Sequence, residues 1–114
     1  QQLVDYVLET FAAAPYAPPN EADVVRQFGN EGELLEAMLE QGLLVRISGG
    51  VLFRQTDFTE MIERVRAAAQ QQGSITLAQV RDLFDTSRKY AQAILEEMDT
   101  RRITKREGDA RVLR

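Results

Sequence analysis

The chain has 114 residues and a formal net charge of −4; 28% of its residues are charged and 44% are hydrophobic. These values are typical of a folded globular protein, either one ordinary domain or two very small ones. The sequence contains no cysteine and no histidine. Disulfides, thiolate chemistry and zinc–sulfur sites are therefore excluded, and the commonest general base and metal ligand is missing. We expect a binding protein and not an enzyme, with no metal or cofactor in this segment.

No apolar run in the sequence reaches the length of a membrane-spanning helix. We therefore expect no membrane contact and a cytoplasmic location.

Charge is distributed unevenly along the chain. Residues 1–57 contain three basic and nine acidic residues, a net charge of −6, whereas residues 58–114 contain eleven basic and nine acidic residues, a net charge of +2. Between residues 101 and 114, six basic residues stand against two acidic ones. Because charges act over a Debye length of roughly 8–10 Å, the local excess matters more than the total. It predicts a polyanionic partner for the end of the chain.

The first half predicts three helices and a hairpin. Helical spacing of apolar residues marks the first helix: Leu3, Val4, Val7, Leu8 and Phe11. A proline-rich segment ends this helix, and Asn20 is the expected N-cap of a second helix that Gly29-Asn30 breaks. A third helix follows, and Gly42 suits the left-handed residue at its end. Ser48-Gly49-Gly50 then lies between two apolar segments, LLVRI and VLFRQ, which predicts a β-hairpin.

The second half repeats this order. We expect Thr59 to cap a helix that ends at Gly73, Thr76 to cap the helix LAQVRDLF, and Asp85 or Thr86 to cap a third helix. A basic hairpin turning at Gly108-Asp109 follows. Shifting the first half by 59 residues superposes apolar positions and the two hairpin glycines, which indicates two copies of one small fold.

Three helices followed by a β-hairpin is the order of a winged helix, in which the hairpin is the wing. We therefore predict a mostly α protein with small β-hairpins (α+β), made of two tandem winged-helix domains at residues 1–57 and 58–114. The acidic first domain is expected to be a spacer or to face another protein.

Two basic segments of the second domain are candidate binding sites. Ser87-Arg88-Lys89-Tyr90 opens the third helix, where free N–H groups and the helix dipole favour an anion. The structural alternative is a capped helix with solvated cations and Tyr90 packed in the core. In the wing, Lys105, Arg106 and Arg111 lie on paired strands, and we expect their charges to converge. The alternative there is an edge hairpin that is charged to prevent aggregation.

Two other charged groups are interpreted as structural. Arg81 and Asp82 are adjacent on a helix, so we expect no ion pair between them. The carboxylates of Glu96, Glu97 and Asp99 are interpreted as a solvated helix face.

Residues 81–111 resemble the C-terminal module of the bacterial selenocysteine-specific elongation factor, the SelB family. The matching positions are Arg81-Asp82-Leu83, Thr86-Ser87-Arg88-Lys89-Tyr90, Leu95-Glu96, Asp99, Thr104, Arg106, Gly108-Asp109 and Arg111. Two positions depart from the family pattern: Lys105 replaces an arginine, and Glu107 replaces an apolar residue. The resemblance is dense over about the last 40 residues and looser before them.

The resemblance implies an RNA-binding fragment that recognises the mRNA hairpin directing selenocysteine insertion at UGA. The implied RNA-binding residues are Ser87, Arg88, Lys89, Tyr90, Lys105, Arg106, Gly108 and Arg111. GTP and selenocysteyl-tRNA would be bound by domains of the factor that this segment lacks. We expect a monomer that binds an mRNA stem-loop, with the ribosome as a further candidate partner. The alternatives are a winged-helix DNA-binding regulator and a tandem winged-helix protein-interaction module.

Overall fold

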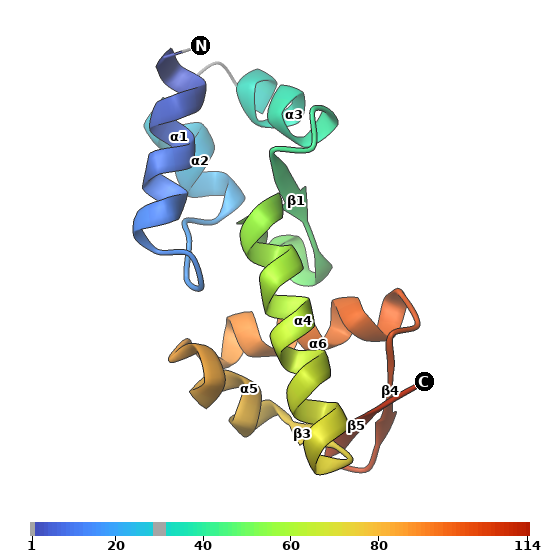
Figure 1. Ribbon diagram of the computed structural model, residues 1–114. Helices are drawn as coiled ribbons and strands as arrows, with labels where there is room; N and C mark the ends of the chain where they lie inside the picture. Colours follow the sequence, from blue (N-terminus) through green and yellow to red (C-terminus); the bar gives the residue numbers. More distant parts are fainter. Residues whose placement is uncertain (1, 29–31) are drawn as a thin grey trace. The chain divides into compact units, whose positions relative to one another are not determined.

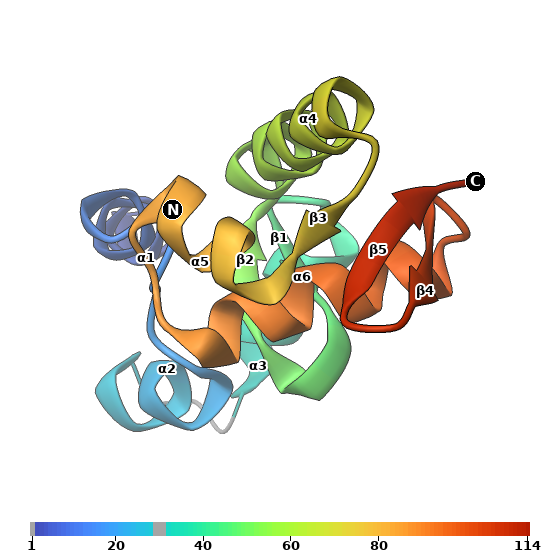
Figure 2. The same cartoon turned by 90° about the horizontal axis from the view of Figure 1, so that it is seen from below.

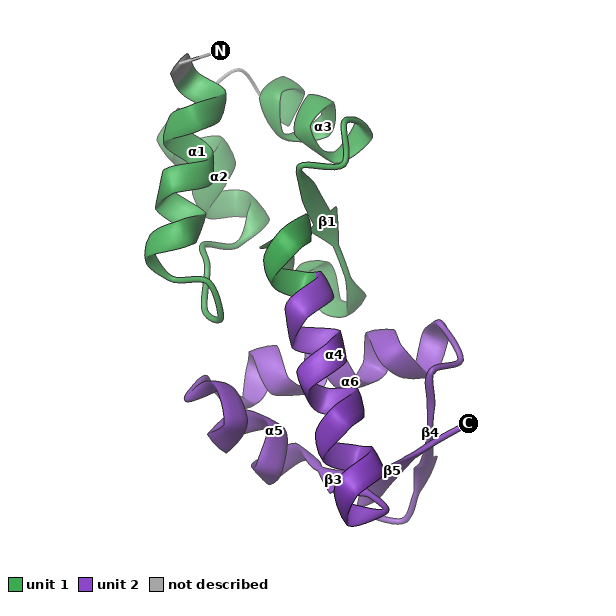
Figure 3. Cartoon of the chain, in the orientation of Figure 1, with its two compact units in different colours: residues 1–58 green, residues 59–114 purple. Residues whose placement is uncertain are grey.

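A computed structural model describes residues 2–28 and 32–114. The chain divides into two compact units, residues 1–58 and residues 59–114 (Figure 3). Each unit combines helices with a small antiparallel sheet, which confirms the predicted fold class. None of the described helices is both long and apolar enough to cross a membrane. The helix break predicted at Gly29-Asn30 lies outside the described residues.

The described residues of unit 1 form three α-helices, a short 3-10 helix at Ser48–Gly50 and a two-stranded sheet, before the start of α4 (Gln55–Gln72) (Figure 1). The α-helices and strands are α1 (Gln2–Ala13), α2 (Glu21–Phe28), α3 (Glu33–Glu40), β1 (Leu44–Arg46) and β2 (Leu52–Arg54). The Asp23 N–H donates to Asn20 Oδ1 at 2.8 Å, so the predicted N-cap of α2 is confirmed. The core gathers apolar residues from α1, α2, α3 and both strands: Val7, Phe11, Val24, Leu35, Met38, Leu44 and Leu52.

Helix α4 (Gln55–Gln72) starts directly after β2. Thr59 therefore lies inside the helix, and the predicted N-cap at that residue is wrong. Arg54, the last residue of β2, donates to both carboxylate oxygens of Asp57 at 2.7 and 2.9 Å, which holds an acidic residue in the first turn. Phe58, fully buried, stacks on Phe53 with ring centroids 6.3 Å apart. With these contacts the helix begins at Gln55, five residues earlier than an N-cap at Thr59 would place its first residue.

Unit 2 adds a third strand to the same plan. Its remaining elements are β3 (Ile75–Thr76), α5 (Leu77–Phe84), α6 (Arg88–Thr100), β4 (Thr104–Glu107) and β5 (Ala110–Leu113). The strands are ordered β3-β5-β4, with both pairs antiparallel (Figure 2). Buried side chains of α4, α5 and α6 form the core against β3: Met61, Val65, Val80, Phe84, Ala91, Ile94, Leu95 and Met98, with Ile75 from the strand.

The helix caps of unit 2 are only partly as predicted. Thr76 caps α5 through a capping box: the Gln79 N–H donates to Thr76 Oγ1, and the Thr76 N–H donates to Gln79 Oε1. The N-cap of α6 is Ser87, so the prediction of Asp85 or Thr86 is wrong. Asp85, with a φ of 49°, and the Thr86 N–H, which donates to the Arg81 carbonyl, belong instead to the end of α5.

Helices α3 and α6 end in the same hydrogen-bonded cap. The Leu43 N–H donates to the Met38 carbonyl at 3.0 Å, and the Ile103 N–H donates to the Met98 carbonyl at 2.9 Å. These caps superpose with an offset of 60 residues, so the predicted offset of 59 is wrong at this point. The apolar pattern does not distinguish the two offsets, because Met38-Leu39 and Leu43-Leu44 are pairs of apolar neighbours that accept either alignment. At the matching left-handed position, unit 1 has Gly42 and unit 2 has Arg102.

Candidate functional site

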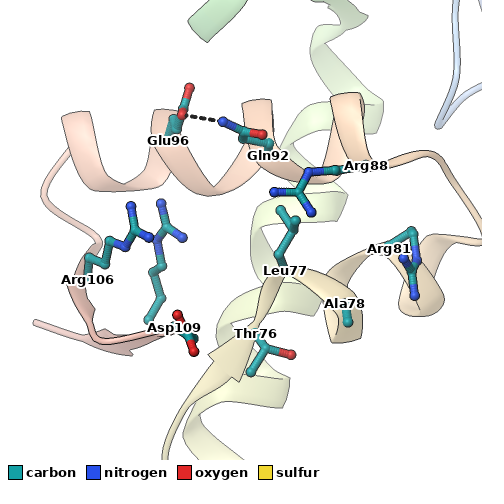
Figure 4. A pocket seen from close by; sticks show the side chains of 10 residues that line it. Thr76, Leu77, Ala78, Arg81, Arg88, Gln92, Glu96, Arg106 and Asp109 are labelled. Atoms are coloured by element: carbon teal, nitrogen blue, oxygen red, sulfur yellow. Dashed lines mark hydrogen bonds between the residues drawn. The ribbon is translucent and has the colours of Figure 1, made fainter.

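Unit 2 contains a cleft between α6, the start of α5 and the β4–β5 hairpin, with a volume of about 360 Å³ (Figure 4). We call it the α6–wing cleft. Four arginines and two acidic residues line it: Arg81, Arg88, Arg106, Arg111, Glu96 and Asp109. Its other lining residues are Thr76, Leu77, Ala78 and Gln92, whose side-chain amide donates to Glu96 at 3.0 Å. The cleft therefore carries a local excess of positive charge.

Arg88 supplies an uncompensated cation at the start of α6. It is exposed, and its side chain is directed toward Leu77 across the cleft (Figure 4). In the part of the chain that the structure describes, its guanidinium has no hydrogen bond or ion pair. Ser87 precedes it as an exposed N-cap whose side chain makes no capping hydrogen bond. The positive charge of Arg88 and the free backbone N–H groups of the first turn of α6 thus lie together at the positive end of the helix dipole.

Lys89 and Tyr90 lie next to the cleft but do not line it. The ammonium of Lys89 lies 5.5 Å from the centroid of the Tyr90 ring, a cation–π contact. Lys89 is exposed, whereas Tyr90 is half-buried. Tyr90 is therefore neither fully packed in the core, which was the predicted structural alternative, nor fully exposed.

The wing divides its three predicted cations between two faces. Arg106 lies opposite Arg111 in the β4–β5 register, and Lys105 lies opposite Val112. Because successive side chains of a strand point to opposite faces, Arg106 and Arg111 share the cleft side and Lys105 faces away. The prediction that all three charges converge is therefore wrong for Lys105. Its Nζ lies 3.8 Å from Glu107 Oε2. Two of the three cations do meet in the cleft.

Gly108 forms the tip of the wing with a φ of +62°. Its carbonyl accepts a hydrogen bond from Arg106 Nε at 3.1 Å. That bond leaves the terminal nitrogens of Arg106 available, and Figure 4 shows them directed toward α6.

Arg111 is held by a carboxylate and is only 8% exposed. Its Nη2 and Nε lie 3.1 and 3.2 Å from Asp99 Oδ2. The other oxygen, Asp99 Oδ1, accepts a hydrogen bond of 2.6 Å from the hydroxyl of Thr104, which is buried. Asp99 in the last turn of α6 thus binds both strands of the wing. The interpretation of Asp99 as part of a solvated helix face is therefore wrong. The sequence contained one indication of this contact: Asp99 lies in the last helical turn before a hairpin that carries a threonine, Thr104, and an arginine, Arg111, which are both able to donate to a carboxylate.

Two further charged residues, Arg81 and Glu97, have local partners. Arg81 Nε lies 3.5 Å from Asp82 Oδ1, so the expectation of no ion pair between these neighbours is wrong. Both side chains are well exposed and flexible enough to meet, and such a pair contributes little to stability. The carboxylate of Glu97 pairs with Arg101 at 2.8 Å, away from the lining of the cleft.

In contrast to Arg88 and Arg106 of unit 2, the hairpin arginines of unit 1, Arg46 and Arg54, form ion pairs with carboxylates. Arg46 donates to Glu21 at 2.6 Å and to Glu36 at 2.8 Å. The hydrogen bond with Glu36, followed by that with Glu21, raises the pKa of Arg46. The hydrogen bonds with Asp57 likewise raise the pKa of Arg54. A hollow beside α2 and α3 is lined by four carboxylates: Glu21, Glu33, Glu36 and Glu40.

The described residues contain no group of three aspartate or glutamate side chains placed to hold a metal ion.

Comparison with known proteins matches both the sequence and the fold. Residues 66–113 match the model of the family "Elongation factor SelB, winged helix". A selenocysteine-specific elongation factor from Desulfomicrobium baculatum is 28% identical over 109 residues, which cover 92% of this chain and 17% of the relative. The chain thus spans about a sixth of that protein's length.

Two solved structures share the fold over the whole chain. The mRNA-binding domain of E. coli elongation factor SelB, solved in complex with SECIS RNA, is 24% identical and superposes with a TM-score of 0.77 over 98% of its own length. A bacterial selenocysteine-specific elongation factor, EF-Sec, is 17% identical and superposes with a TM-score of 0.80 over 18% of its length. The resemblance predicted from residues 81–111 is confirmed: residues 66–113 match the winged-helix model of the SelB family.

Proposed function

We propose that this chain is the RNA-binding part of a selenocysteine-specific elongation factor and recognises the mRNA hairpin that directs selenocysteine insertion at UGA. The observation that carries the proposal is the α6–wing cleft, which four arginines from α5, α6 and the wing line together. The matching E. coli domain was solved with SECIS RNA, which supports a stem-loop as the ligand.

The residues of the cleft suit a folded RNA. The narrow major groove of A-form RNA is closed to side chains, so proteins contact phosphates, 2′-hydroxyls and the unstacked bases of loops. Arg88 and the N–H groups of the first turn of α6 would bind a phosphate, with Ser87 as a further donor. Arg106 would bind a neighbouring phosphate, and Gly108 would allow the backbone to approach closely. Lys89 would add charge beside the cleft, and the ring of Tyr90 would stack on a base.

Arg111 has a different role in this proposal. Because Asp99 already binds its guanidinium, Arg111 acts mainly by holding the wing in place. Arg111 also lines the cleft, so its positive charge would attract the RNA without a direct contact. Lys105, on the opposite face, would contact a different part of the RNA from Arg106.

Unit 1 is proposed to be a spacer or a protein-facing module. Its hairpin arginines are paired with carboxylates, and its acidic hollow would repel phosphates. The ribosome is a candidate partner for this face, and we expect the chain to be a monomer. The proposed work of the segment is binding and not catalysis; GTP binding would belong to other parts of the longer factor, which acts in the cytoplasm.

An RNA titration tests the proposal. Fluorescence anisotropy compares a hairpin from a selenoprotein message with a stem-loop of the same length and scrambled sequence, at several salt concentrations. We expect a clear preference for the first RNA and an affinity that falls steeply with salt. Equal affinity for the two RNAs would overturn the proposed function.

A further inference from the structure

A second hollow of unit 2, with a volume of about 370 Å³, is lined by three arginines and two apolar residues: Arg66, Arg102, Arg114, Ile103 and Leu113. We call it the Arg102 hollow. Arg66 belongs to α4, Arg102 lies in the turn after α6, and Arg114 follows β5. The hollow shares no lining residue with the α6–wing cleft and has no acidic lining residue.

Carboxylates compensate little of this charge. Arg66 lies 3.5 Å from Glu63, and both side chains are well exposed. Across residues 2–28 and 32–114, the guanidiniums of Arg102 and Arg114 have no ion pair or hydrogen bond. Arg102 and Arg114 are therefore two uncompensated positive charges at one hollow, and an anion placed there would be attracted to both.

The backbone of Arg102 is a second, independent observation. Its φ of 61° places a residue with a Cβ in the left-handed conformation, which glycine adopts without steric conflict. The equivalent cap of unit 1 has Gly42 at this position, with a φ of 75°. Unit 2 thus keeps an arginine where the same hydrogen-bonded cap in unit 1 has glycine. Disfavoured backbone conformations of this kind occur preferentially at binding sites, where the side chain has a use.

We propose that the Arg102 hollow binds a phosphodiester of the RNA, outside the segment held in the α6–wing cleft. The inference rests on the proposed function and adds a second contact surface to it. Guanidinium groups bind phosphate oxygens in a planar, two-pronged geometry, which suits the two non-bridging oxygens of a phosphodiester.

The proposal also gives Lys105 a role. The Arg114 N–H donates to the Ile103 carbonyl at 3.1 Å, which continues the β4–β5 pairing by one step. By the alternation of strand side chains, Arg114 therefore shares the wing face of Lys105, opposite to that of Arg106. Both faces of the hairpin thus present cations, and one RNA can contact the wing from two sides.

The phosphodiester has two possible sources: the second strand of the hairpin stem, or single-stranded RNA that flanks it. Two RNAs distinguish them, one ending at the base of the stem and one extended by a flank on each side. A contribution of Arg102 seen with both RNAs assigns the contact to the stem. A contribution seen only with the extended RNA assigns it to the flank.

The decisive variant is Arg102→Gly, because it removes one cation and also relieves the backbone. We expect a higher melting temperature together with a three- to tenfold weaker affinity for the RNA. The slope of log K against log salt should fall by about one unit, as for one lost phosphate contact. Loss of folding cannot explain weaker binding by a more stable protein. Arg66→Gln and Arg114→Gln should each lower affinity in the same way.

The matched control is Arg101→Gln, which removes the same charge one residue earlier, outside the hollow. Equal effects of Arg101→Gln and Arg102→Gly would overturn the proposal, and so would an unchanged affinity and salt slope in Arg102→Gly with both RNAs. In either case Arg88→Gln should still weaken binding, and the proposed function would stand. If the native chain shows no preference for the hairpin, the proposed function itself fails, and this inference with it.

Discussion

Arg111 donates from Nε and Nη2 to a single oxygen of Asp99, at 3.2 and 3.1 Å, and so joins the middle of β5 to the last turn of α6. The other oxygen of Asp99 accepts from Thr104 at the start of β4. One carboxylate therefore sets the position of both wing strands relative to the helix that opens with Arg88. The distance between the two uncompensated cations of the cleft, Arg88 and Arg106, depends on this contact.

Replacing Asp99 with asparagine separates positioning from charge. The variant should lose about 2 kcal/mol of unfolding free energy, because a nearly buried guanidinium loses its anionic partner. It should also bind RNA more weakly, although it is one unit more positive, because the wing is no longer held. Urea denaturation and RNA titration under conditions where the variant is folded measure the two effects.

Glu96→Gln is the control for Asp99→Asn. Glu96 also lines the cleft, but it accepts a hydrogen bond from Gln92 of the same helix and, among the described residues, has no hydrogen bond or ion pair with a wing strand. Its neutralisation should strengthen RNA binding by removing a charge that repels phosphate. If Asp99→Asn strengthened binding as well, the carboxylate would be a neutralising group and not a positioning one.

Exchanging Arg88 and Lys89 for glutamate should abolish RNA binding while the chain stays folded. Both side chains are exposed, and the first turn of α6 contains no acidic residue. Glutamates there interact favourably with the helix dipole, by about 0.3–1 kcal/mol each. We therefore expect thermal melting at an equal or higher temperature and no detectable binding of the hairpin. Retained affinity would place the RNA on another surface.

The sequence predicts those features that depend on a few neighbouring residues. The caps of α2 and α5 are such features, because Asn20 with Asp23 and Thr76 with Gln79 each satisfy backbone groups within one turn. The hairpin tip at Gly108 is another, since its left-handed residue leaves few alternatives. The winged-helix order follows from these local signals.

Features that depend on distant residues were not predictable in the same way. From the sequence, Lys105, Arg106 and Arg111 are three cations of one hairpin with the same expected role. The strand register places Lys105 on the face opposite to Arg106, and the ion pair with Asp99 holds Arg111 in place. The start of α4 likewise depends on Arg54 and Phe53, which belong to the preceding strand. In each case the missing information was which residues a folded partner element places nearby.

Thr76→Ala tests the cap that orients α5 beside the cleft. The substitution removes the acceptor for the Gln79 N–H and should cost about 1 kcal/mol of unfolding free energy. Thr76→Ser keeps the hydroxyl and is the matched control, with an expected loss of less than half that amount. Thermal or urea unfolding measures the difference. Equal losses in the two variants would show that the methyl group of Thr76, and not its hydroxyl, stabilises this turn.

The two hairpins should differ in their contribution to RNA binding. Arg46 in unit 1 already donates to Glu21 and Glu36, whereas the guanidinium of Arg106 in unit 2 makes only a hydrogen bond to the Gly108 carbonyl among the described contacts. Arg46→Ala should therefore leave the affinity for the hairpin and its salt dependence unchanged. Arg106→Ala should weaken binding about tenfold and lower the salt slope by about one unit, since one phosphate contact is lost.

Both arginines are exposed on short hairpins, so neither substitution should lower the melting temperature appreciably. A loss of affinity in Arg46→Ala equal to that in Arg106→Ala would mean that both hairpins contact the RNA, and that the carboxylates of unit 1 release their arginine when it binds.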